Sequence, residues 1–376
     1  MYLFSHFQRM CVLLSFFTIT SCYAITAIEQ LENTISSDQH NQDIIQALAY
    51  NPQIRIENMH ANICPTICIH GFGDSAHSFT HGITFPLNLK SAIHFDLPDA
   101  EIHTNFSFKI LRKTSFGQIS EVLPFLYILK LCHEAGFRAV NIYGMSRGAA
   151  VAVNALAILN NNSYQRQLRK IGIQNGERQA IISMLRNGTV CIDAPLAHVK
   201  YVLHNMVENF RNNLLKKFFN TNTAFNSSIN QPANNPSFAK RILYRLANIT
   251  GKITDFIGSK ILQYCVLPII TSYKPWREET IHSAKKLNNL NIPILLHLEE
   301  NDVNVTNKGD NVLHQRLYNH NPHHTYFHKS NDGGHLAYRQ ELPRILKAFQ
   351  KRYTGAPSTK YTSVLANSRP SPANIC

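Results

Sequence analysis

A strand, a sharp turn and a helix follow one another in the middle of this chain, and they constrain its fold more than any other segment. Residues 140–143, Val-Asn-Ile-Tyr, have the pattern of a buried strand, and the alanine-rich residues 149–159 favour a helix. Between them lies the sequence Gly-Met-Ser-Arg-Gly, from Gly144 to Gly148. Glycines allow strand and helix to approach closely. We therefore expect Ser146 at the apex of a very tight, strained turn.

Further apolar runs predict strands on both sides of this segment. They lie at residues 54–59, 66–69, 92–95, 189–192, 291–298 and 325–328. Helical patterns occur at 115–135, opened by a Ser-x-x-Gln capping box at Ser115, and at 312–318 and 336–353. Strands that alternate with helices predict an α/β fold, with a mostly parallel central sheet and helices on both faces.

The domain organisation follows from where this alternation stops. Residues 196–274 show helical spacing without strand patterns, which predicts an inserted helical cap. The α/β core then comprises residues 25–195 and 275–354. Residues 355–376 are rich in serine, proline and asparagine, and we expect a disordered tail.

The first 24 residues have the pattern of a secretory signal peptide. Arg9 precedes an apolar run at residues 10–19, and small residues follow up to Ala24. The run is too short to span a bilayer, which needs about 20 residues. We predict cleavage after Ala24, and thus a secreted or periplasmic protein. Alternatively, residues 19–22 resemble a bacterial lipobox, in which case Cys22 would carry a lipid anchor.

Cysteines give no zinc pattern, because the pair Cys64 and Cys68 has no second pair to complete a site. Cys68 and Cys191 lie within strand patterns, where a cysteine is usually a small core residue. One disulfide after export stays an open alternative. We predict no metal site.

Ser146 is the candidate nucleophile. A serine hydroxyl needs a base to take its proton, an acid to orient that base, and N–H donors for the developing oxyanion. His335 is the candidate base, because it lies in the sequence Asp-Gly-Gly-His between the last strand pattern and the closing helix. Glycines in such a loop allow it to reach across the end of the sheet.

Asp302 is the candidate acid. It closely follows the strand predicted at 291–298, where a carboxylate can accept the Nδ1–H of the histidine. Glu300 is the nearest alternative. Asp193 is a second alternative, because it directly follows the strand at 189–192.

These features resemble the α/β-hydrolase family over residues 54–195 and 275–353. In that family the catalytic residues follow the order serine, acid, histidine, which corresponds here to Ser146, Asp302 and His335. The match is to the superfamily and not to one of its subfamilies.

The resemblance also implies an oxyanion site and an activity. The sequence His-Gly-Phe-Gly at residues 70–73 follows an early strand, as the oxyanion loop does in that family. The backbone N–H groups of Phe72 and Arg147 would then hold the oxyanion. The implied function is hydrolysis of a small-molecule or lipid ester through an acyl-enzyme on Ser146, as in carboxylesterases and lipases, with no cofactor. A thioesterase, a peptidase or a non-catalytic binding protein on the same scaffold are the alternatives.

Charge is concentrated in the predicted cap. Residues 196–275 contain ten lysines and arginines and two acidic residues, a difference of +8 out of a total net charge of +14. Either the basic face is solvated over an apolar face that packs on the core, or it makes peripheral contact with an anionic membrane. No zinc-finger, RNA-recognition or arginine-stripe pattern is present, so we predict no nucleic-acid partner.

Overall fold

The computed structural model describes more than half of the chain. The described residues are 29–31, 33, 54–57, 64–72, 75, 89, 91–97, 114–219, 255–275, 280–299, 307–330 and 341–353. The predicted signal peptide, the predicted tail and the loops that carry Glu300, Asp302 and His335 lie outside these residues.

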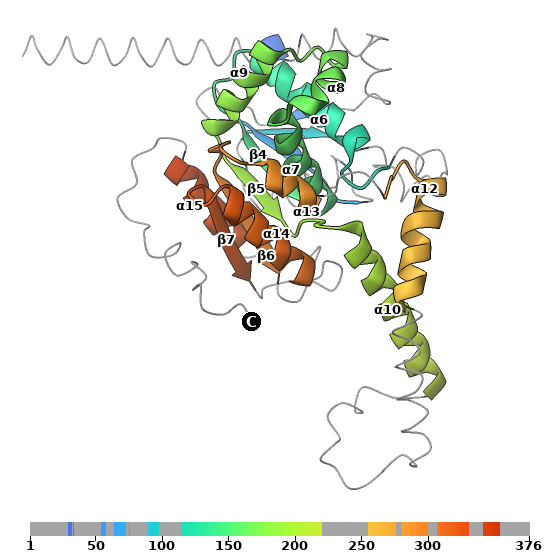
Figure 1. The fold of residues 1–376 in the computed structure, drawn as a ribbon. Helices are drawn as coiled ribbons and strands as arrows, with labels where there is room; N and C mark the ends of the chain where they lie inside the picture. The colour runs from blue at the N-terminus through green and yellow to red at the C-terminus, as the bar shows by residue number, and fades with distance from the viewer. Residues whose placement is uncertain are drawn as a thin grey trace, which may run out of the picture.

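Seven strands form one sheet in the order β1-β3-β2-β4-β5-β6-β7 (Figure 1). Their bounds are β1 Ile54–Glu57, β2 Thr66–Ile69, β3 Ala92–Phe95, β4 Asn141–Met145, β5 Val190–Asp193, β6 Ile294–Glu299 and β7 Thr325–Ser330. The edge strand β1 pairs antiparallel with β3, and every other pairing is parallel. The carboxyl ends of β2 to β7 therefore meet at one edge of the sheet.

The predicted mostly parallel sheet is confirmed, and each predicted strand is present. The ends of the strands differ by a few residues. β4, for example, extends to Met145, beyond the predicted end at Tyr143. The extension arises because Gly144 and Met145 still pair with Ile192 and Asp193 of β5.

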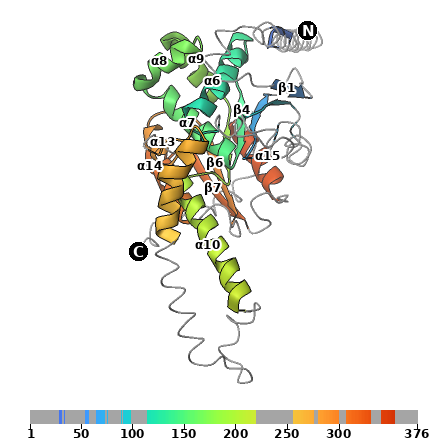
Figure 2. The same cartoon turned by 90° about the vertical axis from the view of Figure 1, so that its right-hand side faces the viewer.

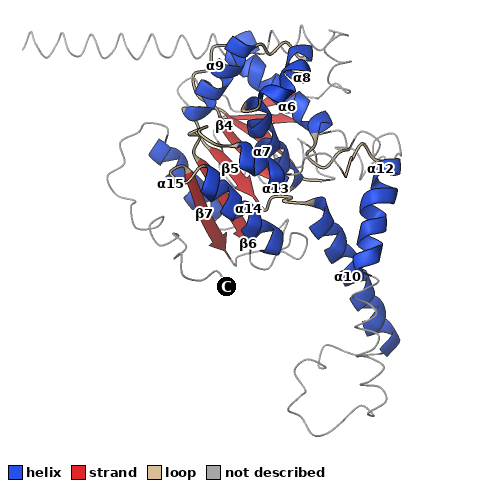
Figure 3. Ribbon diagram, in the orientation of Figure 1, coloured by secondary structure: helices blue, strands red, loops and turns tan. Residues whose placement is uncertain are grey.

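Helices cover both faces of the sheet, as predicted (Figures 2 and 3). Their bounds are α6 Ile119–Glu134, α7 Arg147–Leu159, α8 Gln165–Lys170, α9 Asn175–Arg186, α13 Thr280–Ser283, α14 Asn307–His320 and α15 Leu342–Tyr353. α6, α7, α9, α13 and α14 lie on one face, and α15 lies on the other. Successive residues of a strand point to opposite faces. Accordingly Ile142 of β4 packs in the larger core beneath α6 and α7, whereas Tyr143 packs with Phe349 of α15.

The start of α6 differs from the prediction. The helix begins at Ile119 with Gln118 as its N-cap residue, and the Gln118 side chain makes no capping hydrogen bond. The predicted capping box at Ser115 was therefore wrong. The Glu121 carboxylate instead accepts the backbone N–H groups of residues 115–117. The predicted end of the helix at residue 135 is confirmed, because Ala135 is the C-cap residue and Gly136 follows it in a left-handed conformation with φ +88°.

Two helical segments leave the core together. α10 (Val199–Phe219) runs away from the sheet, and residues 255–270 return beside it through a π-helical turn at Leu262–Val266 into α12 (Leu267–Ile270) (Figures 1 and 2). Arg211 Nη1 lies 3.1 Å from Asp255 Oδ2 and joins the two segments. Within the described part of the chain, no helix combines the length and apolar composition that crossing a bilayer requires.

Candidate active site

Ser146 lies in a strained turn between β4 and α7. Its φ of 55° and ψ of −114° are uncommon for a residue with a side chain. The flanking glycines are required by close contacts. A Cβ atom at Gly148 would lie 2.1 Å from the carbonyl oxygen of Ile69, and one at Gly144 would lie 2.7 Å from that of Gly148. The sequence therefore dictates a turn in which strand and helix meet without room for another side chain.

The backbone around Ser146 is held on both sides. Its N–H donates to the carbonyl oxygen of Asp193 at 2.8 Å, and its own carbonyl oxygen accepts the N–H of Leu196 at 3.0 Å. Ser146 is the N-cap residue of α7, so its side chain lies where the positive end of the helix dipole is directed. Because 8% of the residue is exposed, the hydroxyl group lies in a mostly buried environment.

The predicted oxyanion loop lies directly beside this serine. A Cβ atom built on Gly71 would be 3.5 Å from the Cβ of Ser146. His70 holds the loop from the opposite side, because its Nε2 accepts the N–H of Leu97 at 2.9 Å. Its Nδ1 must then carry the proton that it donates to the carbonyl oxygen of Gly71 at 2.8 Å. His70 is thus a buried residue that holds the turn in place through its two ring nitrogens. Phe72, which follows Gly71, is exposed at the surface.

Arg147 connects the predicted oxyanion loop to helix α6. Its guanidinium group is buried, and Nη2 donates to the carbonyl oxygen of Gly71 at 3.4 Å. Nη1 lies 3.5 Å from Oε1 of the fully buried Glu121. The guanidinium carbon lies 5.5 Å from the ring centre of Phe72. Sequence reasoning assigned only the backbone N–H of Arg147 a role and missed Glu121, for which an acidic residue in an otherwise apolar helix was the available signal.

Aromatic contacts extend from this loop toward the paired helices. The ring of Phe72 stacks on that of Phe116, which meets Tyr273 edge to face. Two hydrogen bonds between Gln118 and the backbone of Lys274 add a second link, at 2.8 and 2.9 Å. These ring contacts and hydrogen bonds therefore link the turn beside Ser146 to the segment that follows α12.

Asp193, an alternative acid, takes part in a buried network across four strands. The hydroxyl group of Tyr143 donates to its Oδ2 at 2.5 Å, and Nδ1 of His297 lies 2.8 Å from its Oδ1. Nε2 of His297 lies 3.3 Å from the hydroxyl oxygen of Ser330. Asp193 and His297 are fully buried. Asp193 therefore has a structural role in joining β4, β5, β6 and β7.

The preferred acid and base, Asp302 and His335, lie outside the described residues, as does Glu300. The strands that lead into their loops are described. β6 and β7 run parallel, and their last residues, Glu299 and Ser330, pair with each other. The loops that carry Asp302 and His335 therefore begin at the same edge of the sheet as Ser146, which directly follows the end of β4.

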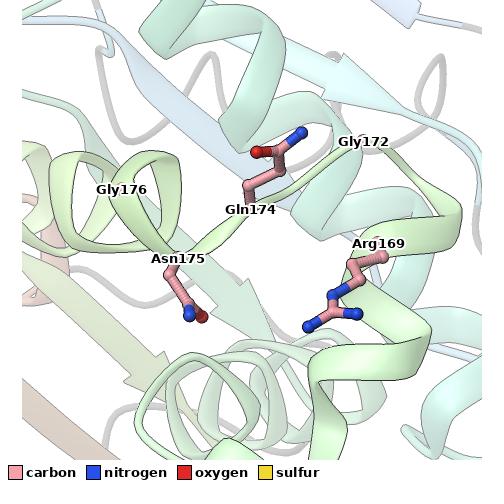
Figure 4. A pocket seen from close by; sticks show the side chains of 5 residues that line it. All are labelled: Arg169, Gly172, Gln174, Asn175 and Gly176. Atoms are coloured by element: carbon pink, nitrogen blue, oxygen red, sulfur yellow. The ribbon is translucent and has the colours of Figure 1, made fainter.

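A hollow of about 530 Å³ lies elsewhere, at the connection between α8 and α9 (Figure 4). It is lined by Arg169, Gly172, Gln174, Asn175 and Gly176. α7 begins directly after Ser146 and leads to α8, and α9 leads back into the start of β5, so this hollow is at the opposite edge of the sheet. In the part of the chain that the structure describes, no three acidic, histidine or cysteine side chains gather as metal ligands would.

Comparison with known proteins gave likenesses in structure only. No protein-family model and no curated protein sequence matches this chain. Among solved structures, an α/β hydrolase from a Medee basin deep-sea metagenome library is 15% identical, with a TM-score of 0.42 and coverage of 83% of this chain and 97% of that one. An esterase of Pyrococcus furiosus is 13% identical, with a TM-score of 0.41 and coverage of 83% and 96%.

Likeness at this level carries no argument about activity, so the assignment of the fold rests on the topology described above. The antiparallel strand β1 at one edge, the parallel order β3-β2-β4-β5-β6-β7 and the division of helices between the two faces are all present. This arrangement is the α/β-hydrolase fold.

Proposed function

We propose that this chain is a serine hydrolase that cleaves an ester-type acyl bond through an acyl-enzyme on Ser146. The observation that carries the proposal is the strained turn that places Ser146 at the carboxyl edge of the sheet, beside the Gly71–Phe72 turn. Backbone strain of this kind clusters at active sites, which supports a catalytic role for this serine.

In the proposed mechanism His335 removes the proton of the Ser146 hydroxyl group as the oxygen attacks the substrate carbonyl carbon. The backbone N–H groups of Phe72 and Arg147 stabilise the oxyanion, and the protonated His335 then gives its proton to the leaving alcohol. Water attacks the acyl-enzyme in the second half, with His335 again taking a proton, and the carboxylic acid and Ser146 are released. Asp302 orients His335 and stabilises its imidazolium form. The mechanism needs no cofactor.

A fluorophosphonate probe tests the nucleophile. The wild-type protein should be labelled, Ser146→Ala should not, and Ser163→Ala serves as the matched control because Ser163 is exposed and remote in the chain from the turn. Equal labelling of the wild type and Ser146→Ala would exclude catalysis at this serine. Failure of the wild type to react, with the protein folded, would favour a non-catalytic binding protein.

The identity of the acid can be tested separately. Asp302→Asn should lower kcat by about four orders of magnitude, because the base loses its orientation and its counter-charge. Asp193→Asn should chiefly lower stability, since its carboxylate joins Tyr143 and His297 inside the sheet. The opposite result, a folded Asp193→Asn protein with abolished turnover and an active Asp302→Asn protein, would transfer the role to Asp193. Glu300→Gln, measured in the same way, tests the third candidate acid.

Substrate class is open within the proposal. Hydrolysis of p-nitrophenyl esters with acyl chains from about two to sixteen carbons would separate carboxylesterase from lipase behaviour, because a pocket that buries more CH₂ groups gains affinity with each. Matched thioesters and peptide anilides address the alternative activities. Faster turnover of a thioester or an anilide than of its ester would overturn the ester assignment.

Export is part of the proposal. Leu31, seven residues after the expected cleavage site, is 1% exposed and packs in the main core. Leu31 thus contributes to the folded domain, which fits a mature protein that starts at Ile25. Mass spectrometry of the N-terminal peptide from exported protein tests this, and a lipid-modified Cys22 would show that the alternative anchor is used.

A further inference from the structure

The helical segment at residues 255–264 has buried polar side chains and exposed apolar side chains. Its inward side carries the polar residues Asp255, Ser259 and Gln263, which are 2%, 6% and 2% exposed. Its outward side carries apolar residues that are more than half exposed. We call these the outer face: Phe256, Ile257, Ile261 and Tyr264, with Ile269 beyond the π-helical turn. A surface helix of a soluble protein normally has the opposite arrangement.

Specific contacts fix this orientation. Asp255 faces Arg211 of α10, and Nε2 of Gln263 donates to the hydroxyl group of Tyr273 at 3.1 Å. The hydroxyl group of Ser259 donates to the carbonyl oxygen of Phe256 at 2.9 Å. Turning the helix over would break the contacts of Asp255 with Arg211 and of Gln263 with Tyr273, whereas the bond of Ser259 lies within the helix. The apolar side chains are therefore held outward, where they form a patch of the kind that marks an interaction site.

Charge around the outer face favours one kind of partner. Arg211 lies 3.6 Å from Glu208 as well as near Asp255, so the two acidic residues of this region face the same arginine. Residues 196–275 carry a net charge of +8 in the sequence, and Lys200, Lys260 and Lys274 are the lysines among them whose side chains the structure describes. Lys260 belongs to the outer face itself, since its Nζ lies 5.9 Å from the ring centre of Phe256 and 5.0 Å from that of Tyr264.

We propose that the outer face docks on an anionic lipid surface. Aromatic and aliphatic side chains can enter the boundary between headgroups and acyl chains, while the stem of Lys260 lies along the rings and its ammonium group reaches lipid phosphate. A second copy of the chain fits less well, because a two-fold contact would bring together two outer faces that each carry Lys260. The paired helices also extend away from the sheet (Figures 1 and 2).

Vesicle sedimentation of the full chain tests the proposal. The protein should pellet with phosphatidylcholine vesicles that contain about one quarter phosphatidylglycerol, and much less with phosphatidylcholine alone. Raising the salt from about 0.1 M to about 0.5 M should weaken binding severalfold, because screening shortens the reach of the lysines. Ser146→Ala should bind equally well, so a failure of the proposed catalysis and a failure of membrane docking are distinguishable.

Two matched pairs of variants locate the contact. Tyr264→Ser should weaken vesicle binding about tenfold, whereas Tyr318→Ser, at a tyrosine of α14 that is similarly exposed (46% against 51%), should not. Lys260→Glu should weaken it at least about fivefold, and Lys170→Glu of α8 should not. All four variants should hydrolyse a short soluble ester like the wild type if the proposed activity is present, and should unfold at the same temperature.

Three results would overturn the proposal. The first is equal binding of Tyr264→Ser and Tyr318→Ser to anionic vesicles. The second is no binding of the wild type to vesicles of either composition. The third is concentration-dependent self-association of the wild type that Tyr264→Ser abolishes, with no lipid binding, which would assign the outer face to a second copy of this chain.

Discussion

The buried ion pair of Glu121 and Arg147, next to the Gly71–Phe72 turn, gives the sharpest prediction for stability. Glu121 is fully buried, its Oε1 lies 3.5 Å from Nη1 of Arg147, and its two oxygens accept backbone N–H groups at 2.5, 3.2 and 2.6 Å. Glu121→Gln keeps the size of the side chain but removes the charge and turns one acceptor into a donor. An uncompensated buried guanidinium and an unpaired N–H group then remain.

The expected cost is large. Removing one partner of a buried pair costs about 3–5 kcal/mol, most of it from the charge left behind. Glu134→Gln is the matched control, because Glu134 lies on the same helix in an exposed i,i+4 pair with Lys130. An exposed pair of this kind is worth less than about 1 kcal/mol. The same substitution in the same helix should thus give two very different results.

Urea unfolding followed by circular dichroism measures both. With a slope near 3 kcal/mol per molar, Glu121→Gln should lower the midpoint by about 1–2 M, and Glu134→Gln by less than about 0.3 M. Combined with Arg147→Met, Glu121→Gln should cost less than the sum of the two single changes. Equal midpoints for the two glutamine variants would refute the claim that Glu121 neutralises Arg147.

Three further predictions follow from close packing and burial. Gly148→Ala should destabilise the fold by at least about 1–3 kcal/mol in thermal unfolding, because its Cβ would meet backbone oxygen at 2.1 Å, while Gly176→Ala, with open space, should be neutral or stabilising. Burial lowers the pKa of His94 from 6.5 to about 4. The unfolded chain therefore takes up the extra proton, so about 3 kcal/mol of stability should be lost as pH falls through this window, and His94→Leu should reduce that loss. Burial raises the pKa of Cys132 to about 12, so iodoacetamide should modify the exposed Cys265 and spare Cys132 in site-resolved mass spectrometry.

Local patterns explain why much of the fold was predictable. The strand-turn-helix around Ser146 depends on glycines and apolar residues that are neighbours in sequence, so the pattern contains the constraint. Cys68 and Cys191 are buried core residues, as their strand positions predicted. α9 was missed although a local signal existed, namely the reciprocal capping box of Gln174 and Glu177.

Long-range pairings explain most of what was missed in the candidate site. Glu121 and Arg147 are ordinary charged residues until the fold buries both, and His297 meets Asp193 only because β5 and β6 are neighbours in register. No spacing in the sequence marks such pairs. The capping box at Ser115 failed for the same reason, because a carboxylate committed to Arg147 is a stronger acceptor for the N–H groups of that loop than the side chain of Gln118.

The helix at residues 255–264 shows a further reason why periodicity alone is insufficient. Apolar residues recur along it at helical spacing, and the usual interpretation would turn Phe256, Ile261 and Tyr264 toward the core. The structure turns them outward. A periodic pattern identifies a face but not what that face contacts, and here the contact of Asp255 with Arg211 decides the orientation. When the polar side chains of a helix bind partners inside the domain, its apolar side chains face outward and can contact a surface outside the domain. The charge of nearby side chains, here Lys260, then indicates the kind of surface.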